Sequence, residues 1–206
     1  MAAQSGDFAE QIAELKGVLL GTGSVDDFLL DLAVLAAREL GEDLSCGIIL
    51  QPRDRPLTVA SSDVTAAQVD EVQYSLYQGP CLHSIRTGEH VRIDDLVFDR
   101  RWWEYAVRAL ARGVRSSLSI PVSAQGHPVG SINLYSDRPR FFDDAQTQRA
   151  EQFAAEATDA VGHAAQLAGQ GDPLVAVSCP GDLSTPHSSL APASGSPSPA
   201  STSPLQ

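Results

Sequence analysis

The sequence predicts an α+β fold in which a small antiparallel sheet has helices beside it and loops folded over one face. Residues 79–144 contain, in order, a short helix, a short strand, a helix, two strands and the start of a long helix. The two strands alternate apolar and polar residues, as in a sheet with one apolar face. Apolar residues at helical spacing also occur near both ends of this region, so we expect flanking helices.

Two amphipathic helices are expected before the first strand. The first ends at the break Gly21-Thr22-Gly23. Ser24 is suited to cap the second helix, since Asp27 follows three residues later and Gly41 lies past its end. The apolar positions of the first helix are Phe8, Ile12, Leu15, Val18 and Leu19.

The middle of the chain is rich in short elements. Residues 46–50 and 57–61 flank a segment with two prolines, which predicts a hairpin. A helix is expected over residues 64–76, a short helix over 81–86, and a short strand over 91–93.

A further helix is expected to begin at Asp99, which is suited to the N-cap, and to stop at Gly113. Its apolar stripe, expected to face the core, consists of Trp103, Ala106, Val107 and Leu110.

The strands over 114–122 and 128–135 are the clearest in the chain, and a turn over 124–127 joins them into an antiparallel hairpin. Their apolar face is expected to pack on the terminal helices. If residues 63–112 cover the other face, its side chains supply hydrogen-bonding groups inside a cavity, as a ligand site requires. That polar face carries Ser117, Ser119, Ser131, Asn133 and Tyr135.

The last helix is expected to begin at Asp143, with Gln146 three residues later as in a capping box. At about 24 residues, or roughly 36 Å, it exceeds the span of a small sheet, so its far end needs a further partner, which the N-terminal helix offers. Its apolar positions are Ala150, Phe153, Ala154, Ala157, Val161, Ala164 and Leu167.

The chain divides into three parts on these grounds. Residues 1–23 are an N-terminal helix and linker, and residues 24–168 are the folded domain. Residues 169–206 hold 7 of the 13 prolines and no Lys, Arg or Glu, which predicts a disordered tail.

Composition and charge exclude several classes of function. A net charge of -12 disfavours binding to nucleic acid and to anionic lipid. Three scattered cysteines give neither a disulfide framework nor the paired spacing of a zinc site, so no metal is expected. The chain shows neither a signal peptide nor an apolar run long enough to span a bilayer, and we expect a cytoplasmic protein.

Residues 24–168 resemble a GAF domain of the type found in actinobacterial regulators. The resemblance rests on GPCLHSIRTGEHVRIDDL, DRRWWEYAVRALARGVRSSLSIPV, GSINLYS and the FFDD that opens the last helix. It implies a central antiparallel sheet of five or six strands, terminal helices on one face, and a pocket under loops and short helices on the other. It also implies binding of a small molecule and dimerisation through the terminal helices.

The chain departs from well-known members of that family. Residues 169–206 are too short and too rich in proline and serine to be the RNA-binding ANTAR domain of similar regulators. The NKFDE-type signature of cyclic-nucleotide binding is absent, and Leu82 separates Cys81 from His83, unlike a bilin attachment site. No cofactor is therefore assigned.

Several other residues could have a role in ligand binding or chemistry, but a role in packing or on the solvated surface is preferred for them. Cys81 is interpreted as a small buried residue, and His83 as a residue that is exposed or lines the pocket. Trp103 is a candidate wall of the pocket, although ordinary packing explains it too. The arginines of residues 100–115 are interpreted as a solvated helix face paired with Glu104 and nearby aspartates, with an anionic ligand as the alternative. They are Arg100, Arg101, Arg108, Arg112 and Arg115.

The sequence therefore predicts a non-enzymatic sensory or regulatory module that acts through a separate effector protein. One alternative is a degenerate scaffold whose pocket is filled by its own side chains and which only dimerises or docks. Another is an enzyme like the free methionine sulfoxide reductases, although Cys46 and Cys81 do not reproduce their cysteine cluster. The candidate ligand-binding residues are Ser117, Ser119, Ser131, Asn133, Tyr135, Trp103, His83 and Cys81.

Overall fold

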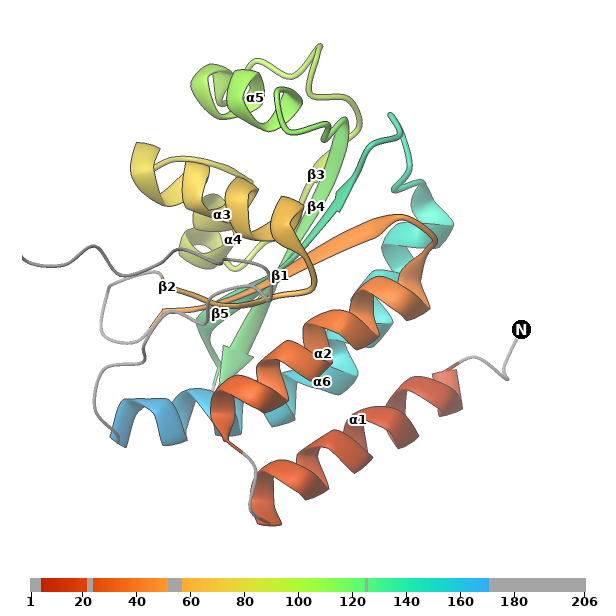
Figure 1. Cartoon of the computed structure of the whole chain (residues 1–206), viewed down its shortest axis with the longest axis vertical. Helices are drawn as coiled ribbons and strands as arrows, with labels where there is room; N and C mark the ends of the chain where they lie inside the picture. The colour runs from red at the N-terminus through yellow and green to blue at the C-terminus, as the bar shows by residue number, and fades with distance from the viewer. Residues whose placement is uncertain (1–4, 22–23, 52–56, 125, 171–206) are drawn as a thin grey trace, which may run out of the picture.

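A five-stranded antiparallel sheet forms the centre of the molecule, with strand order β2-β1-β5-β4-β3. The structure is a computed structural model, and it describes residues 5–21, 24–51, 57–124 and 126–170 (Figure 1). The strands are β1 (Leu44–Leu50), β2 (Leu57–Ser61), β3 (Val91–Ile93), β4 (Ser116–Ala124) and β5 (His127–Ser136). The α+β class and the antiparallel sheet predicted from the sequence are confirmed.

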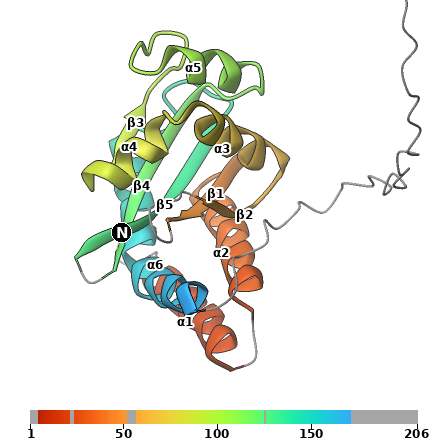
Figure 2. The same cartoon turned by 90° about the vertical axis from the view of Figure 1, so that its left-hand side faces the viewer.

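Helices cover both faces of the sheet, and Figures 1 and 2 show the two groups on opposite sides. One face carries α1 (Ser5–Gly21), α2 (Val25–Leu40) and α6 (Asp144–Gln170). The other carries α3 (Val64–Leu76), α4 (Pro80–Thr87) and α5 (Trp103–Leu110). Residues 63–112, which contain these three helices, thus cover the polar side of the sheet and leave little of that side exposed to solvent.

The caps expected for the two long helices are present. The Ser24 hydroxyl accepts a hydrogen bond from the Asp27 amide at 3.0 Å, and the Asp143 carboxylate accepts one from the Gln146 amide at 2.8 Å. Each bond satisfies an amide that the first helical turn would otherwise leave unpaired. These caps fix where α2 and α6 begin.

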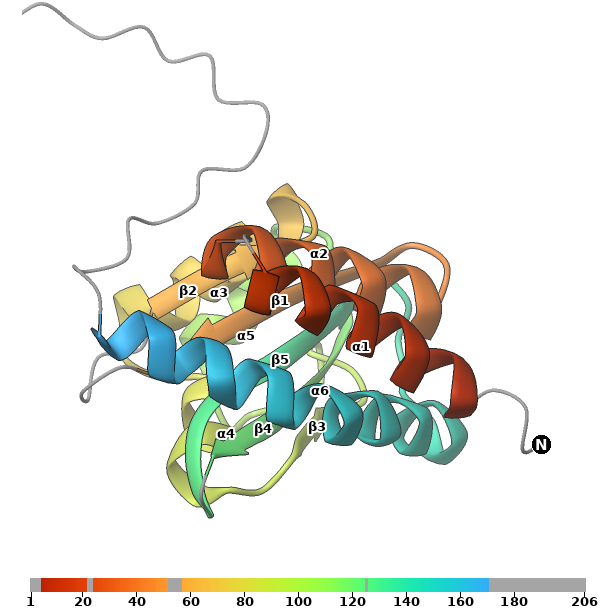
Figure 3. The same ribbon diagram turned by 90° about the horizontal axis from the view of Figure 1, so that it is seen from below.

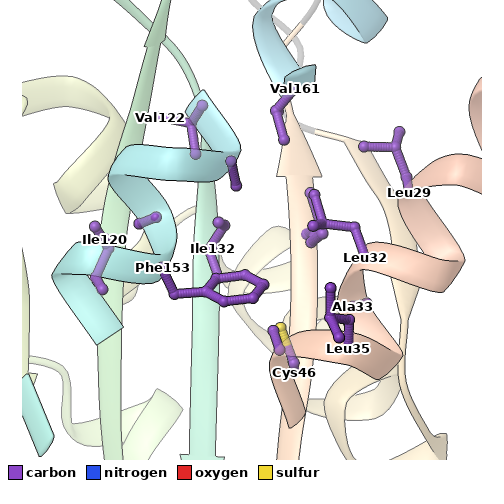
Figure 4. Close-up of a cluster of buried hydrophobic side chains, with 14 of the residues drawn as sticks. Leu29, Leu32, Ala33, Leu35, Cys46, Ile120, Val122, Ile132, Phe153 and Val161 are labelled. Carbon is purple, nitrogen blue, oxygen red and sulfur yellow. The ribbon is translucent and has the colours of Figure 1, made fainter. Parts of the chain in front are cut away.

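The main core lies between the sheet and the terminal helices. Figure 4 shows Phe153 of α6 pointing between Ile132 of β5 and Cys46 of β1. Because β4 and β5 send alternate residues to this side, Leu118, Ile120 and Leu134 are also buried here. The alanines of α6 let this helix approach the sheet closely.

Helix α1 packs on both α2 and α6, as Figure 3 shows from below. Its Phe8 ring meets the Phe153 ring edge to face, with centroids 5.4 Å apart. The expected pairing of the first and last helices is therefore present. Two apolar positions were predicted wrongly, because Val18 and Leu167 are exposed.

The helix α5 differs from its prediction in both start and orientation. It begins at Trp103, while Asp99 closes the preceding turn by accepting from the Arg101 amide. Its buried face consists of Tyr105, Ala106 and Ala109. Of the predicted stripe, Ala106 is buried and Leu110 packs partly buried against the same cluster, whereas Trp103 and Val107 are exposed.

The predicted tail, apart from the last two residues of α6, lies outside the described residues. Among the described helices, none has the length and apolar character needed to cross a membrane.

Candidate functional site

Small side chains form the floor of the candidate site, on the sheet face beneath α3, α4 and α5. The strand register places Ser119, Asn133, Gly47 and Ser61 side by side across β4, β5, β1 and β2. In the next row Ser117 lies opposite Tyr135. Such a row leaves space that larger residues would fill, so polar groups from the helices above can reach the sheet.

Helix α3 supplies two polar groups from above. Ala66, Val69, Asp70 and Gln73 follow the spacing of one helix face, and all four are buried. A Cβ atom at Gly47 would collide with the Asp70 carboxylate, so the glycine makes room for this side chain. Gly79 makes room for Gln73 in the same way.

A buried hydrogen-bond network joins α3 to β5 and α4. The Tyr135 hydroxyl donates to Asp70 Oδ1 at 2.5 Å, and Asn133 Nδ2 donates to the same oxygen at 3.2 Å. Gln73 Nε2 donates to the Tyr135 oxygen at 3.0 Å, while Gln73 Oε1 accepts from the Cys81 amide at 2.9 Å. Ser131 extends the network by donating to Asn133 Oδ1 at 2.8 Å.

The Asp70 carboxyl is buried in this network without a neighbouring cation among the described residues. None of the six linked residues is a cation, and Asp70 is fully buried. Burial raises the pKa of Asp70 to about 7, against the opposing effect of the hydrogen bonds from Tyr135 and Asn133. Burial also raises the pKa of the Tyr135 hydroxyl well above its usual range, and the nearby Asp70 adds to that rise.

Several buried polar atoms on this side of the sheet make no hydrogen bond to the described residues. Among them are Asp70 Oδ2 and hydroxyls on strands β2 and β4 and on helices α4 and α5. Burial raises the pKa of the Tyr105 hydroxyl, although Ser117 lies close enough to counteract part of that rise. Buried polar groups normally have partners, so these atoms mark a place that water or a polar ligand would complete. The hydroxyls are those of Ser61, Ser84, Tyr105, Ser117 and Ser119.

The residues nominated from sequence fall into three places. The five polar residues of β4 and β5 lie together on the buried face, and Cys81 is buried nearby against Ile49 and Ile85. His83 faces away from that group, with its ring 5.5 Å from the Trp102 ring, at the edge of a surface pocket of about 380 Å³. Trp103 lies on the outer face of α5 and is 59% exposed, so it does not help to close the site.

Sequence reasoning missed the residues that the helices contribute, chiefly Asp70, Gln73 and Tyr105. A signal was present in α3, because a carboxylate and an amide occupy positions that the helical spacing assigns to the core. Their partners on β5 are more than sixty residues away in sequence, so spacing alone does not pair them.

Across the parts of the chain that the structure describes, no three His, Cys, Asp or Glu side chains come close enough to hold an ion. The site residues are hydroxyls, amides and one carboxyl, a set suited to hydrogen bonding with an organic molecule.

The sequence model of the GAF domain matches residues 25–161, which is most of the described chain. The chain belongs to the GAF domain family. The resemblance inferred from the sequence motifs is thereby confirmed. No protein of curated function matches the sequence.

Solved structures share the fold of this GAF protein at low sequence identity. The GAF domain of an Acinetobacter phosphoenolpyruvate-protein phosphotransferase has a TM-score of 0.60 and 20% identity, over 81% of this chain and 98% of its own. The phycocyanobilin-bound GAF domain of a cyanobacterial phytochrome has a TM-score of 0.58 and 12% identity, over 81% of this chain and 98% of its own. The free methionine-R-sulfoxide reductase of Neisseria meningitidis, solved with its substrate, has a TM-score of 0.56 and 13% identity, over 82% of this chain and 95% of its own.

Proposed function

We propose that this GAF protein is a non-enzymatic regulatory module that binds one small polar molecule between the sheet and helices α3, α4 and α5. The observation that carries this proposal is the set of buried polar atoms without partners on one sheet face. Each such atom costs stability unless a hydrogen bond replaces the one it made to water. A ligand that bonds to them would stabilise this closed arrangement.

The chemistry of these atoms limits the ligand. Asp70 Oδ2 accepts a hydrogen bond when the carboxyl is ionised and can donate one when it is protonated, so the ligand offers a donor or an acceptor at this position. Hydroxyls such as Ser117 and Ser119 both donate and accept, so they suit a ligand with mixed polar groups. The network contains no cation that would favour an anionic ligand.

The signal would reach a separate effector protein through the terminal helices. Helix α6 packs on β4, the strand that carries Ser117 and Ser119 on its other side. A ligand that shifts β4 would therefore bias the position of α6, and with it that of α1 and any second copy bound there.

A closed scaffold is the second candidate function, and a specific observation favours it. The bonds of Asp70, Gln73 and Tyr135 to one another fill space that a ligand would otherwise use. In that case the unpaired hydroxyls hold water only, and the domain serves to dimerise or to dock.

Reductase chemistry with two cysteines is disfavoured by their placement. Cys46 lies on the side of the sheet that faces α2 and α6, whereas Cys81 lies on the opposite side. Burial raises the pKa of both thiols well above their usual range, which keeps the reactive thiolate scarce.

Native mass spectrometry of the protein purified from its source tests the proposal. We expect one small molecule retained per chain, and its loss from the variant Tyr105→Phe/Ser117→Ala. Ser123→Ala, on the same strand but lining a groove on the α6 side, is the matched control and should keep the molecule. Repeated absence of added mass from the wild-type protein would favour the closed scaffold.

A further inference from the structure

The outer face of α5 carries an apolar pair that the fold does not use. Trp103 and Val107 are four residues apart and therefore adjacent on one helix face. Their exposed fractions are 59% and 46%, although the opposite face of the same helix is buried. Contiguous exposed apolar surface marks interaction sites more often than single exposed residues do, and here two exposed apolar side chains lie next to each other.

Arginines lie next to this apolar pair in the sequence, and one of them contacts it. The guanidinium of Arg100 lies over the Trp103 ring, 5.2 Å from its centroid. Arg108 and Arg112 extend the basic surface toward the end of the helix, where Arg112 donates to the Arg108 carbonyl oxygen.

Among the residues that the structure describes, three of these arginines have no carboxylate within ion-pair distance, although Glu104 lies on the same helix four residues before Arg108. Within the described residues, Arg101 pairs with Asp99 and Arg115 with Asp95, but Arg100, Arg108 and Arg112 form no ion pair. The sequence interpretation of the group as a solvated surface holds for these three, which are exposed, but the expected pairing with carboxylates is found only for Arg101 and Arg115. A chain with net charge -12 thus keeps a local basic surface beside exposed apolar residues.

We propose that the α5 patch, defined as Arg100, Trp103, Val107, Arg108 and Arg112, docks an acidic segment of a partner protein that carries an apolar anchor residue. Tryptophan and arginine are the residues most enriched among those that dominate binding energy at protein interfaces. Free guanidinium groups around the apolar pair select carboxylates by charge complementarity. A nucleic acid would fit the patch itself, but the acidic remainder of the chain repels it.

The position of the patch separates this contact from the terminal helices. Figures 1 and 2 show α5 at the end of the molecule remote from α1. A partner can therefore occupy the patch while α1 and α6 contact a second copy. The inference does not depend on a bound small molecule, since it rests on the outer face of α5 alone.

Selection from a phage-displayed library of random 16-residue peptides against the full-length protein tests the proposal. Selected peptides should be enriched in Asp and Glu around an aromatic or leucine residue. Trp103→Ala should weaken their binding by at least about tenfold, as expected for a central interface residue. Val107→Ser should also weaken it, and raising NaCl should lower the affinity further because the contact is electrostatic.

Val34→Ser is the matched control, because Val34 of α2 has an exposed fraction of 45% against 46% for Val107. Binding should be unchanged in this variant. The proposal is overturned if no peptide is selected, if the selected peptides are not acidic, or if Trp103→Ala leaves their binding intact. Light scattering provides a second test. If the wild type is a dimer and Trp103→Ala is a monomer, the patch is a contact between copies of this chain and the proposal of a separate partner is overturned.

Discussion

At the scale of single residues, the candidate site depends on a carboxyl buried without a cation. Asp70 reaches the sheet only because Gly47 lacks a side chain, and its charge is stabilised by two hydrogen bonds from β5. Burial nevertheless dominates, so the protonated form is favoured in the folded state up to a pKa of about 7. Asp70 therefore links the stability of the domain to pH.

The pH dependence of Asp70→Asn measures this link. An acid whose pKa is higher in the folded than in the unfolded state costs stability as pH rises between the two values, here from about 4 to about 7. When the pH is raised from 5 to 8, the free energy of unfolding of the wild type should fall by about 2–3 kcal/mol relative to that of Asp70→Asn. Urea unfolding at both pH values provides the free energies, and parallel changes in the two proteins would contradict the assignment.

The variant Gly47→Ala tests the fit between Asp70 and the sheet. The added methyl group occupies the place of the carboxylate, so we expect a loss of about 1–3 kcal/mol in the free energy of unfolding. Gly17→Ala is the control: a Cβ there meets open space within a helix, and it should stabilise by about 0.5–1 kcal/mol. Equal effects of the two substitutions in thermal or urea unfolding would show that Asp70 has room to move.

At the scale of elements, local signals predicted most boundaries and failed where packing decides. The caps at Ser24 and Asp143 are hydrogen bonds between residues three apart in the sequence, so the spacing of residue types predicts them. The orientation of α5 is different, because it is set by the packing of Tyr105, Ala106 and Ala109 against distant residues of the core, which leaves Trp103 exposed. The roles of Asp70 and Gln73 also escaped prediction, since distant residues of β5 satisfy them.

The contact between α1 and α6 can be tested by removing an aromatic side chain from it. Phe8 is buried and meets Phe153 edge to face, so Phe8→Ala should cost about 3–5 kcal/mol. Hydrogen exchange should show faster opening of the amides of α1 while those of β4 and β5 stay protected. Unchanged protection of α1 would mean that the helix is held by other contacts.

At the scale of the whole molecule, the sheet separates two surfaces with different proposed roles. The helices α1, α2 and α6 form one layer, on which the proposed dimer would be built, and the other layer carries the candidate site and the α5 patch (Figure 1). From the alternation in β4 and β5, the sequence predicted the layer of terminal helices on the apolar face. It left open whether the polar face is solvated or covered by residues 63–112, and the resemblance to GAF domains implied that it is covered. The sequence did not predict how tightly the second layer closes over the polar face.

Dimerisation through the terminal helices has a direct test. Val18 and Leu20 are exposed on α1, with fractions of 58% and 60%, and they point to nearly opposite sides of the helix, so a second copy that packs on either side would bury one of them. Light scattering should give a dimer for the wild type and a monomer for Val18→Glu/Leu20→Glu. Val64→Glu, at an exposed position of α3 on the other layer, should remain dimeric. A monomeric wild type would remove the terminal helices from the proposed route of the signal.

A high-resolution crystal structure of the protein purified from its source tests most directly whether the buried polar face binds a small molecule. We expect electron density for one organic molecule within hydrogen-bond distance of Ser117, Ser119 and Tyr105. Density for ordered water alone, or direct bonds among these hydroxyls with no space between them, would contradict this expectation.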